Sequence, residues 1–83
     1  MLNVSVISPE AVLFEGTTES VVAPAFDGLV GILTGHAPMM TLLGKGELRL
    51  GAEGAGQRFH VEGGFLQVVD DTVRVVTEHA SKV

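Results

Sequence analysis

Residues 58–76 read RFHVEGGFLQVVDDTVRVV and carry the clearest structural signal in the chain. Phe59 and Val61 alternate with polar neighbours, which is the period of a strand with one buried face. A Gly-Gly pair and then Asp70-Asp71 separate three β-rich runs. Two turn residues between such runs predict a tight hairpin at the aspartates. The segment as a whole predicts three consecutive strands.

A period of two also governs the first half of the chain. Leu2, Val4 and Val6 alternate with polar residues and predict a strand that ends at Ser8-Pro9. Further short apolar runs follow, each ended by glycine, proline or a polar residue. These runs are residues 12–14, 19–25, 30–33, 39–43 and 47–50. Gly16 is expected to end the first of them, and Pro24 predicts that the end of the second lies at a sheet edge or in a turn.

These runs together predict an all-β fold. Eight or nine short strands in 83 residues have the spacing of a sandwich or barrel, and no segment of ten or more residues has a helical period. The eleven glycines are expected in turns and bulges. The segment GAEGAG, residues 51–56, is expected to be a flexible hairpin connection. We therefore expect residues 1–83 to form one compact all-β domain.

The composition is poor in charge for a chain of this size. Hydrophobic residues make up 46% and charged residues 18%, against roughly 25% charged in an ordinary soluble domain. A domain this small buries only somewhat more than ~60% of its unfolded surface, so part of the apolar excess is expected to meet a partner. A net charge of −5, with five scattered basic residues, argues against nucleic-acid binding.

The sequence also excludes some locations. No apolar stretch approaches the ~20 residues that span a bilayer. The N-terminal residues lack the basic region and apolar segment of a signal peptide, so the cytoplasm is the expected compartment.

Few residues suit catalysis or metal binding. The chain has no cysteine, which excludes disulfides, thiolate metal sites and a cysteine nucleophile. His36, His60 and His79 are 24 and 19 residues apart, spacings that match no common metal motif. The serines lie in no nucleophile motif, and Asp70-Asp71 are expected to be turn residues rather than an acid–base pair. We expect no catalytic residue, no metal and no cofactor.

One segment has more backbone-specifying residues than its length requires. Residues 24–38 read PAFDGLVGILTGHAP, with three glycines between two prolines. That density indicates a defined backbone shape. Two interpretations are open: a β-bulge with two turns, or a shaped loop that presents Phe26, Leu29, His36 and Met39 to another protein.

Four spaced motifs resemble a known family. They are SPEAVLFEG (8–16), P-x-x-D-G-x-x-G-I-L-x-G-H-A-P (24–38), T-x-L-x-x-G-x-L-R (41–49) and F-x-V-x-G-G-F-L-x-V (59–68). In this order, from about Val4 to Ala80, they resemble the N-terminal β-sandwich domain of the epsilon subunit of F-type ATP synthase. The resemblance implies a flattened sandwich of ten strands in the rotary central stalk.

The resemblance also implies a role. In this family the domain is not catalytic; it binds the gamma subunit on one side and the membrane-embedded c-ring at its base, and couples proton-driven rotation to ATP synthesis. Ser8, His36 and Thr41 fall at positions on or near the gamma-facing surface. The Asp27-Gly28 turn falls at the tip that faces the c-ring. The family commonly has a glutamate where this chain has Leu29, so we expect Asp27 to supply the charge and Leu29 an apolar contact.

Members of the family usually continue into a two-helix hairpin that can inhibit ATP hydrolysis and in some members binds ATP. This chain ends at Val83 with no helical pattern, so it is either a fragment or a natural short form. Helix-mediated inhibition and ATP sensing are expected to be absent from it. The expected location is the cytoplasmic face of the bacterial inner membrane, as a peripheral part of the complex.

Two alternatives come from other classes of protein. Biotinyl and lipoyl carrier domains are acidic sandwiches of this size that display a lysine on a hairpin, and Lys45 would be that lysine. Its two glycine neighbours differ from the Met-Lys-Met or Asp-Lys-Ala of carriers, so we expect a solvated lysine at a hairpin tip. The second alternative is a small β-barrel enzyme with a metal at His36.

Overall fold

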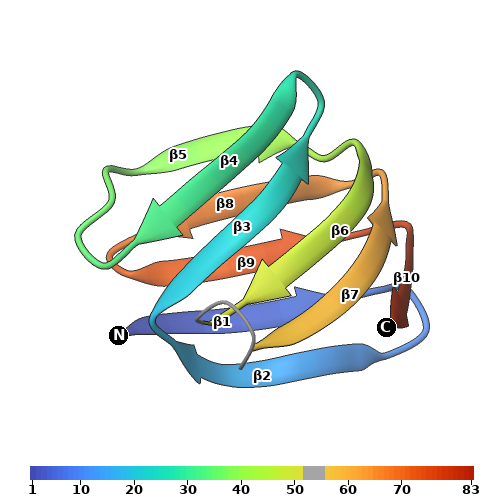
Figure 1. Ribbon diagram of the computed structural model, residues 1–83, viewed down its shortest axis with the longest axis horizontal. Coiled ribbons are helices and arrows are strands. Elements are labelled where there is room, and N and C mark those ends of the chain that lie inside the picture. Colours follow the sequence, from blue (N-terminus) through green and yellow to red (C-terminus); the bar gives the residue numbers. More distant parts are fainter. Residues whose placement is uncertain (52–55) are drawn as a thin grey trace.

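The computed structural model describes residues 1–51 and 56–83, and in these residues it consists of strands and turns without a helix (Figure 1). The strands are β1 (Leu2–Ile7), β2 (Val12–Thr18), β3 (Ser20–Ala25), β4 (Gly28–Leu33), β5 (Met39–Leu42), β6 (Lys45–Leu50), β7 (Gln57–Glu62), β8 (Phe65–Val69), β9 (Thr72–Val76) and β10 (His79–Lys82). The all-β prediction is confirmed. Most of the expected connection at 51–56 lies outside the described residues.

The strands form two five-stranded sheets that stack as a sandwich. Sheet A has the order β2-β1-β9-β8-β5, and sheet B has the order β10-β7-β6-β3-β4. Neighbouring strands are antiparallel except β1 and β9, which are parallel. The β5–β6 and β7–β8 connections both pass from one sheet to the other, and they are hydrogen-bonded to each other. The Leu43 N–H donates to the Gly64 carbonyl at 2.9 Å, and the Gly63 N–H donates to the Gly44 carbonyl at 3.2 Å.

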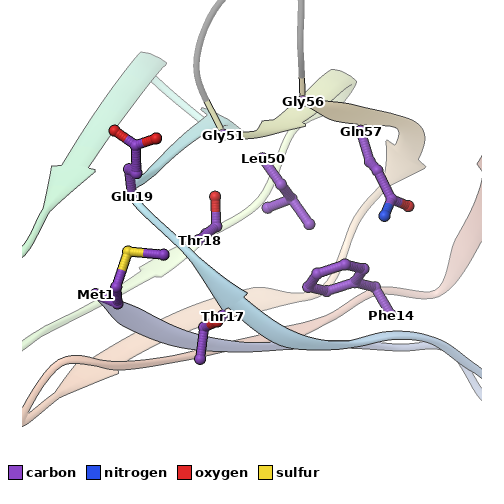
Figure 2. Close-up of a pocket in the computed structure, with 9 residues that line it drawn as sticks. All are labelled: Met1, Phe14, Thr17, Thr18, Glu19, Leu50, Gly51, Gly56 and Gln57. Carbon is purple, nitrogen blue, oxygen red and sulfur yellow. The ribbon is translucent and has the colours of Figure 1, made fainter.

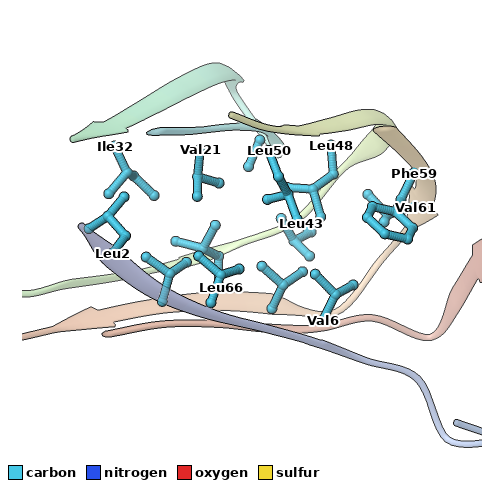
Figure 3. Close-up of a cluster of buried hydrophobic side chains, with 14 of the residues drawn as sticks. Leu2, Val6, Val21, Ile32, Leu43, Leu48, Leu50, Phe59, Val61 and Leu66 are labelled. Atoms are coloured by element: carbon cyan, nitrogen blue, oxygen red, sulfur yellow. The ribbon is translucent and has the colours of Figure 1, made fainter. Parts of the chain in front are cut away.

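The core lies between the sheets and follows the period of two. Strands β1, β7, β8 and β9 bury alternate residues, and side chains from the two sheets point toward each other (Figure 3). The described core residues are Leu2, Val4, Val6, Val21, Ala23, Ile32, Leu43, Leu48, Leu50, Phe59, Val61, Leu66, Val68, Val73 and Val75. Burial of one such large side chain stabilises the fold by roughly 1.5–3 kcal/mol. The sandwich therefore accounts for much of the apolar excess in the composition.

The hairpin between β8 and β9 has the turn that the sequence predicts. Val69 pairs with Thr72, which leaves Asp70 and Asp71 as a two-residue turn. Their φ angles are 48° and 58°. Two consecutive positive φ angles define the type I′ turn, whose twist matches that of the flanking strands.

Two strand boundaries differ from the expected ones. The second strand does not stop at Gly16, because Gly16 pairs with Val4 and the ladder with β1 continues to Thr18. Pro24 lies inside β3 and pairs with Leu29 of β4, so its expected place in a turn is wrong. The described pairs between β3 and β6 end at Val22, and the Pro24 carbonyl accepts from the Gly44 N–H at 2.8 Å, so no ladder N–H is required of the proline.

The described part of the chain contains no helix of the length and hydrophobicity that a membrane crossing requires.

Candidate interaction surfaces

The outer face of sheet A carries a line of apolar side chains, one from each strand. In the register, Leu42 lies opposite Phe65, Phe65 opposite Val76, Val76 opposite Ile7, and Ile7 opposite Val12. We call these five residues the apolar row. Its end residues Leu42 and Val12 are 62% and 59% exposed, and the three between them are half-buried. Paired residues share one face of a sheet, so the row is continuous across all five strands.

The next line of residues on this face is mostly polar. Pairing places Met40, Gln67, Arg74, Ser5 and Glu15 in register with one another, in that order across the sheet. The apolar row is therefore bounded by polar side chains on one side, which is the usual anatomy of a protein–protein contact.

The outer face of sheet B has a different character at β6 and β7. Its ion pairs are Lys45–Glu62 at 3.9 Å, Arg49–Glu47 at 2.6 Å, Arg58–Glu47 at 3.7 Å and His60–Glu62 at 3.3 Å. These side chains are partly or largely exposed, so each pair contributes at most about 1 kcal/mol and interacts strongly with water. On this face the large exposed apolar side chains among the described residues, Leu29 and Leu33, belong to edge strand β4, whereas on sheet A apolar side chains continue across all five strands. The outer face of sheet A is therefore the better suited to an extended contact with another protein.

The β3–β4 hairpin forms a second candidate surface. Ala25 pairs with Gly28, which leaves Phe26 and Asp27 as the turn. Phe26 is 67% exposed and Leu29 is 75% exposed, and the described ion pairs do not include Asp27. The hairpin tip thus combines an available carboxylate with two large apolar side chains.

A backbone hydrogen bond joins this tip to the apolar row. The Phe26 N–H donates to the Leu42 carbonyl at 2.9 Å, and Leu42 is the end of the row on β5. The expected c-ring residues Asp27, Gly28 and Leu29 lie together at this corner of the sandwich.

The three expected gamma-facing residues are not close together. Ser8 follows the last residue of β1, whereas His36 precedes the first residue of β5. Because β5 runs in the same direction as β1, the two residues lie at opposite ends of sheet A; Figure 1 shows the β1–β2 connection on the right and the β4–β5 connection on the left. Thr41 pairs with buried Leu66, so its side chain is directed to the inner face at the sheet edge.

Each of these three residues also has a local structural role. The Ser8 N–H donates to the Ala11 carbonyl at 2.9 Å, and the Ser8 hydroxyl lies 3.3 Å from both backbone groups of Ala11, which closes the β1–β2 turn. The His36 Nδ1 lies 2.7 Å from the Ala37 carbonyl oxygen. The Thr41 hydroxyl donates to the Leu42 carbonyl at 3.5 Å.

The glycine-rich segment 24–38 is a strand between two connections. Residues 28–33 form β4, so the interpretation as one continuous shaped loop is wrong. Phe26 and Leu29 are exposed, as a presenting segment requires, but Met39 packs against the core, so its expected presentation to a partner is wrong. Gly31 lies opposite Val22 on the outer face and adds no bulk there.

Two pockets have no residue of the apolar row in their lining. One, of about 300 Å³, lies at the end of the sandwich between Phe14 and Leu50 (Figure 2). The other, of about 460 Å³, lies beside Ser8 and includes His60, Glu62 and His79. Within residues 1–51 and 56–83, no three histidine, aspartate or glutamate side chains are grouped to hold a metal ion. The histidines thus give no support to a metal enzyme.

The position of Lys45 differs from the expected one. It is the first residue of β6 and pairs with Glu62 of β7, so the placement at a hairpin tip is wrong. The reason is that β5 and β6 belong to different sheets, and Leu43 and Gly44 connect them across the sandwich instead of reversing the chain within one sheet. A carrier domain requires its lysine on an exposed hairpin turn, so the structure does not favour that alternative.

Sequence reasoning did not identify the apolar row. A signal for it exists in adjacent apolar residues at strand ends, such as Val6-Ile7, Phe65-Leu66 and Val75-Val76. Only one residue of each pair can face the core, so the other must face outward. Whether these outward residues align depends on strand order and register, which the alternation of one strand does not specify.

Known proteins resemble the chain in sequence over nearly its whole length. The epsilon chain of ATP synthase from Leptospira borgpetersenii is 45% identical over 80 residues, which are 96% of this chain and 63% of that protein. The corresponding chain from a Synechococcus strain is 40% identical over 81 residues, which are 98% of this chain and 59% of that protein. The chain therefore spans about three fifths of the length of these relatives.

Solved structures have the same fold. A chain in the structure of the Euglena gracilis mitochondrial ATP synthase, described as OSCP/F1/c-ring, matches with a TM-score of 0.87 at 21% identity, over 98% of this chain and 52% of that chain. A chain in the central stalk/c-ring structure of the Tetrahymena thermophila mitochondrial ATP synthase matches with a TM-score of 0.78 at 17% identity, over 96% of this chain and 65% of that chain. At these identities the likeness concerns the fold.

A family model gives the most direct assignment. The model described as ATP synthase, Delta/Epsilon chain, beta-sandwich domain, matches residues 1–83. This match agrees with the order of the four motifs and with the two-sheet architecture. The chain therefore belongs to the ATP synthase delta/epsilon chain family, of which it is the β-sandwich domain.

Proposed function

We propose that residues 1–83 act as one domain in the central stalk of an F-type ATP synthase, as a non-catalytic epsilon-type subunit between the gamma subunit and the c-ring. Family membership and the names of the sequence relatives support this role. The related folds in central stalk and c-ring structures are consistent with it. The work of the domain is then mechanical: it holds two parts of the rotor together while torque passes between them.

The observation that carries the proposal is the apolar row. A permanent contact with gamma would remove the five side chains from water, and the ion pairs of β6 and β7 on sheet B would stay in solvent. Burial of apolar area is the main favourable term in such an association. In this arrangement His36 and Ser8 lie at opposite ends of the contact face, where they would delimit it.

We further propose that the β3–β4 hairpin meets the c-ring. The exposed Asp27 carboxylate offers a partner for a basic side chain in a polar loop of the ring, and Leu29 adds apolar area. Because the Phe26–Leu42 hydrogen bond joins this corner to the apolar row, the two contacts would be mechanically continuous. The complex would place the domain peripherally at a membrane, and for a bacterial enzyme at the cytoplasmic face of the inner membrane.

A charge placed in the apolar row tests the gamma contact. Val76→Lys introduces an ammonium at the centre of the row, and Val22→Lys makes the same change at a half-buried position on the outer face of sheet B. We expect Val76→Lys to weaken binding to purified gamma at least about tenfold, because a charge in a desolvated contact costs several kcal/mol, and Val22→Lys to bind nearly as the unmodified chain does. Calorimetric titration gives both Kd values, and circular dichroism checks that both variants fold.

Equal affinity of the two variants for gamma would place the contact elsewhere. Failure of the unmodified chain to bind gamma would contradict the proposed function itself.

A further inference from the structure

The β4–β5 connection, residues 34–38, passes from sheet B to sheet A beside the β8–β9 hairpin. The two lie together at the left of Figure 1. The Gly35 N–H donates to Asp71 Oδ1 at 2.7 Å, although the residues are 36 positions apart in the sequence. The backbone of Asp71 makes a second distant contact, because the Asn3 N–H donates to the Asp71 carbonyl at 2.8 Å. Asp71 thus joins the hairpin turn, the connection and the start of β1.

The Asp71 carboxylate has a contact that the turn itself does not require. Turns of this type are dominated by glycine, asparagine and aspartate, so the backbone of both aspartates is one that this residue type tolerates. Asp70 and Asp71 both have positive φ angles, 48° and 58°. Only the Asp71 carboxylate accepts from the connection among the described hydrogen bonds, and such a bond between an N–H and an ionised carboxylate is stronger than a neutral one.

The anchored connection leads directly to residues of the proposed contact face. The bonds of His36 are local: its N–H donates to the carbonyl of Leu33, the last residue of β4, at 3.1 Å, and its Nδ1 lies beside the Ala37 carbonyl. The next strand, β5, is an edge strand with β8 as its single neighbour in sheet A, and it contributes Leu42 to the apolar row. The start of this short edge strand is therefore held by the connection that Asp71 anchors.

We propose that Asp71 is a positioning residue for partner binding: its carboxylate holds the Gly35 backbone and so sets the places of His36 and edge strand β5 on the contact face. Asp71 does not itself have to touch the partner. This inference rests on the proposed function, because it assumes that gamma binds the outer face of sheet A.

Three variants distinguish the hydrogen bond between Asp71 and Gly35 from the backbone conformation of the β8–β9 turn. Asp71→Gly removes the acceptor and relaxes the positive φ, whereas Asp70→Gly relaxes the neighbouring positive φ and leaves the acceptor in place. Asp71→Asn keeps a side-chain oxygen and a residue type that tolerates this backbone. A merely structural role in the turn predicts similar Gly35 exchange and similar gamma affinity for the two glycine variants. A positioning role predicts that these two quantities change only in Asp71→Gly.

The first measurement is amide hydrogen exchange of Gly35 in the free chain. We expect exchange at Gly35 to accelerate about tenfold or more in Asp71→Gly, to stay within about threefold of the unmodified rate in Asp70→Gly, and to be largely restored in Asp71→Asn. The second measurement is the Kd for purified gamma. We expect it to rise about fivefold or more in Asp71→Gly, with little change in the other two variants.

Either of two results would overturn the inference: unchanged Gly35 exchange in Asp71→Gly, or equal gamma affinity of the two glycine variants. If the unmodified chain does not bind gamma, the proposed function and the positioning role of Asp71 in partner binding are both overturned. In that case the exchange of Gly35 still decides whether Asp71 anchors the connection.

Discussion

A single methyl group added at Gly64 should destabilise the sandwich severely. Gly64 lies where the chain crosses from sheet B to sheet A, immediately before Phe65 of the apolar row. Its φ is +96°, and a Cβ atom built there would lie 1.9 Å from the Val76 carbonyl oxygen. Because that oxygen belongs to the backbone at the end of β9, rotation of a side chain cannot relieve the overlap. The Gly64→Ala variant must shift one of the two segments.

The size of the effect follows from two terms. A residue with a side chain at positive φ costs roughly 1–2 kcal/mol, and overpacking of a filled site typically costs roughly 1–3 kcal/mol. The total of about 2–5 kcal/mol is a large part of the ~4–12 kcal/mol of stability typical for 83 residues. A loss of ~3 kcal/mol would lower the Tm of a domain of this size by roughly 12–24 °C.

The control is Gly31→Ala in β4, where a built Cβ meets no atom within 4 Å and φ lies outside the left-handed region. We expect its free energy of unfolding to stay within about 0.5 kcal/mol of the unmodified value or to rise slightly. Urea denaturation followed by circular dichroism measures both variants. If the two unfold at free energies within about 0.5 kcal/mol of each other, the close approach of Gly64 to β9 is refuted.

Two further changes test the surfaces. Asp27→Asn should lower recovery of the c-ring with gamma and this chain by up to about fivefold, because an exposed ion pair contributes at most about 1 kcal/mol. Undiminished recovery would contradict a role for this carboxylate. Leu29→Glu is the companion variant, which adds the charge that is common in the family. Glu47→Gln, which loses the pairs with Arg49 and Arg58, should cost less than about 1 kcal/mol in urea denaturation, a difference that about 1 M salt should remove. A larger, salt-independent loss would show that this face is not simply solvated.

The strands were largely predictable because burial and strand geometry share one period. Alternation identifies β1, β7 and β9 directly, and the paired aspartates identify the β8–β9 hairpin. The boundaries at Gly16 and Pro24 were not predictable, since both residues are tolerated where a neighbouring strand satisfies the backbone. Lys45 was misplaced because a short Gly-containing segment can reverse a chain within one sheet or pass to the other, and local sequence does not distinguish the two.

The candidate surfaces, like the strands, could be predicted only in part from the sequence. A hairpin tip near Asp27 and Leu29 was foreseen from the motif, but the two turn residues are Phe26 and Asp27 instead of the expected Asp27 and Gly28, because Gly28 pairs with Ala25. The expected gamma residues Ser8 and His36 are far apart in the fold, and their contact with a partner stays a prediction. Strand order is what places residues from five strands in one row, so no single segment reveals it.

The sequence by itself determined that this protein is an all-β sandwich of the ATP synthase delta/epsilon family, because side-chain alternation, turn residues and motif order are all local or linear properties. Only the tertiary structure decided which outward side chains align as the apolar row, which corner joins this row to the Asp27 hairpin, and that Asp71 reaches Gly35 across 36 residues. These features depend on the register of paired strands and on how the two sheets are connected. A shift of one residue in that register would send every side chain of a strand to its other face.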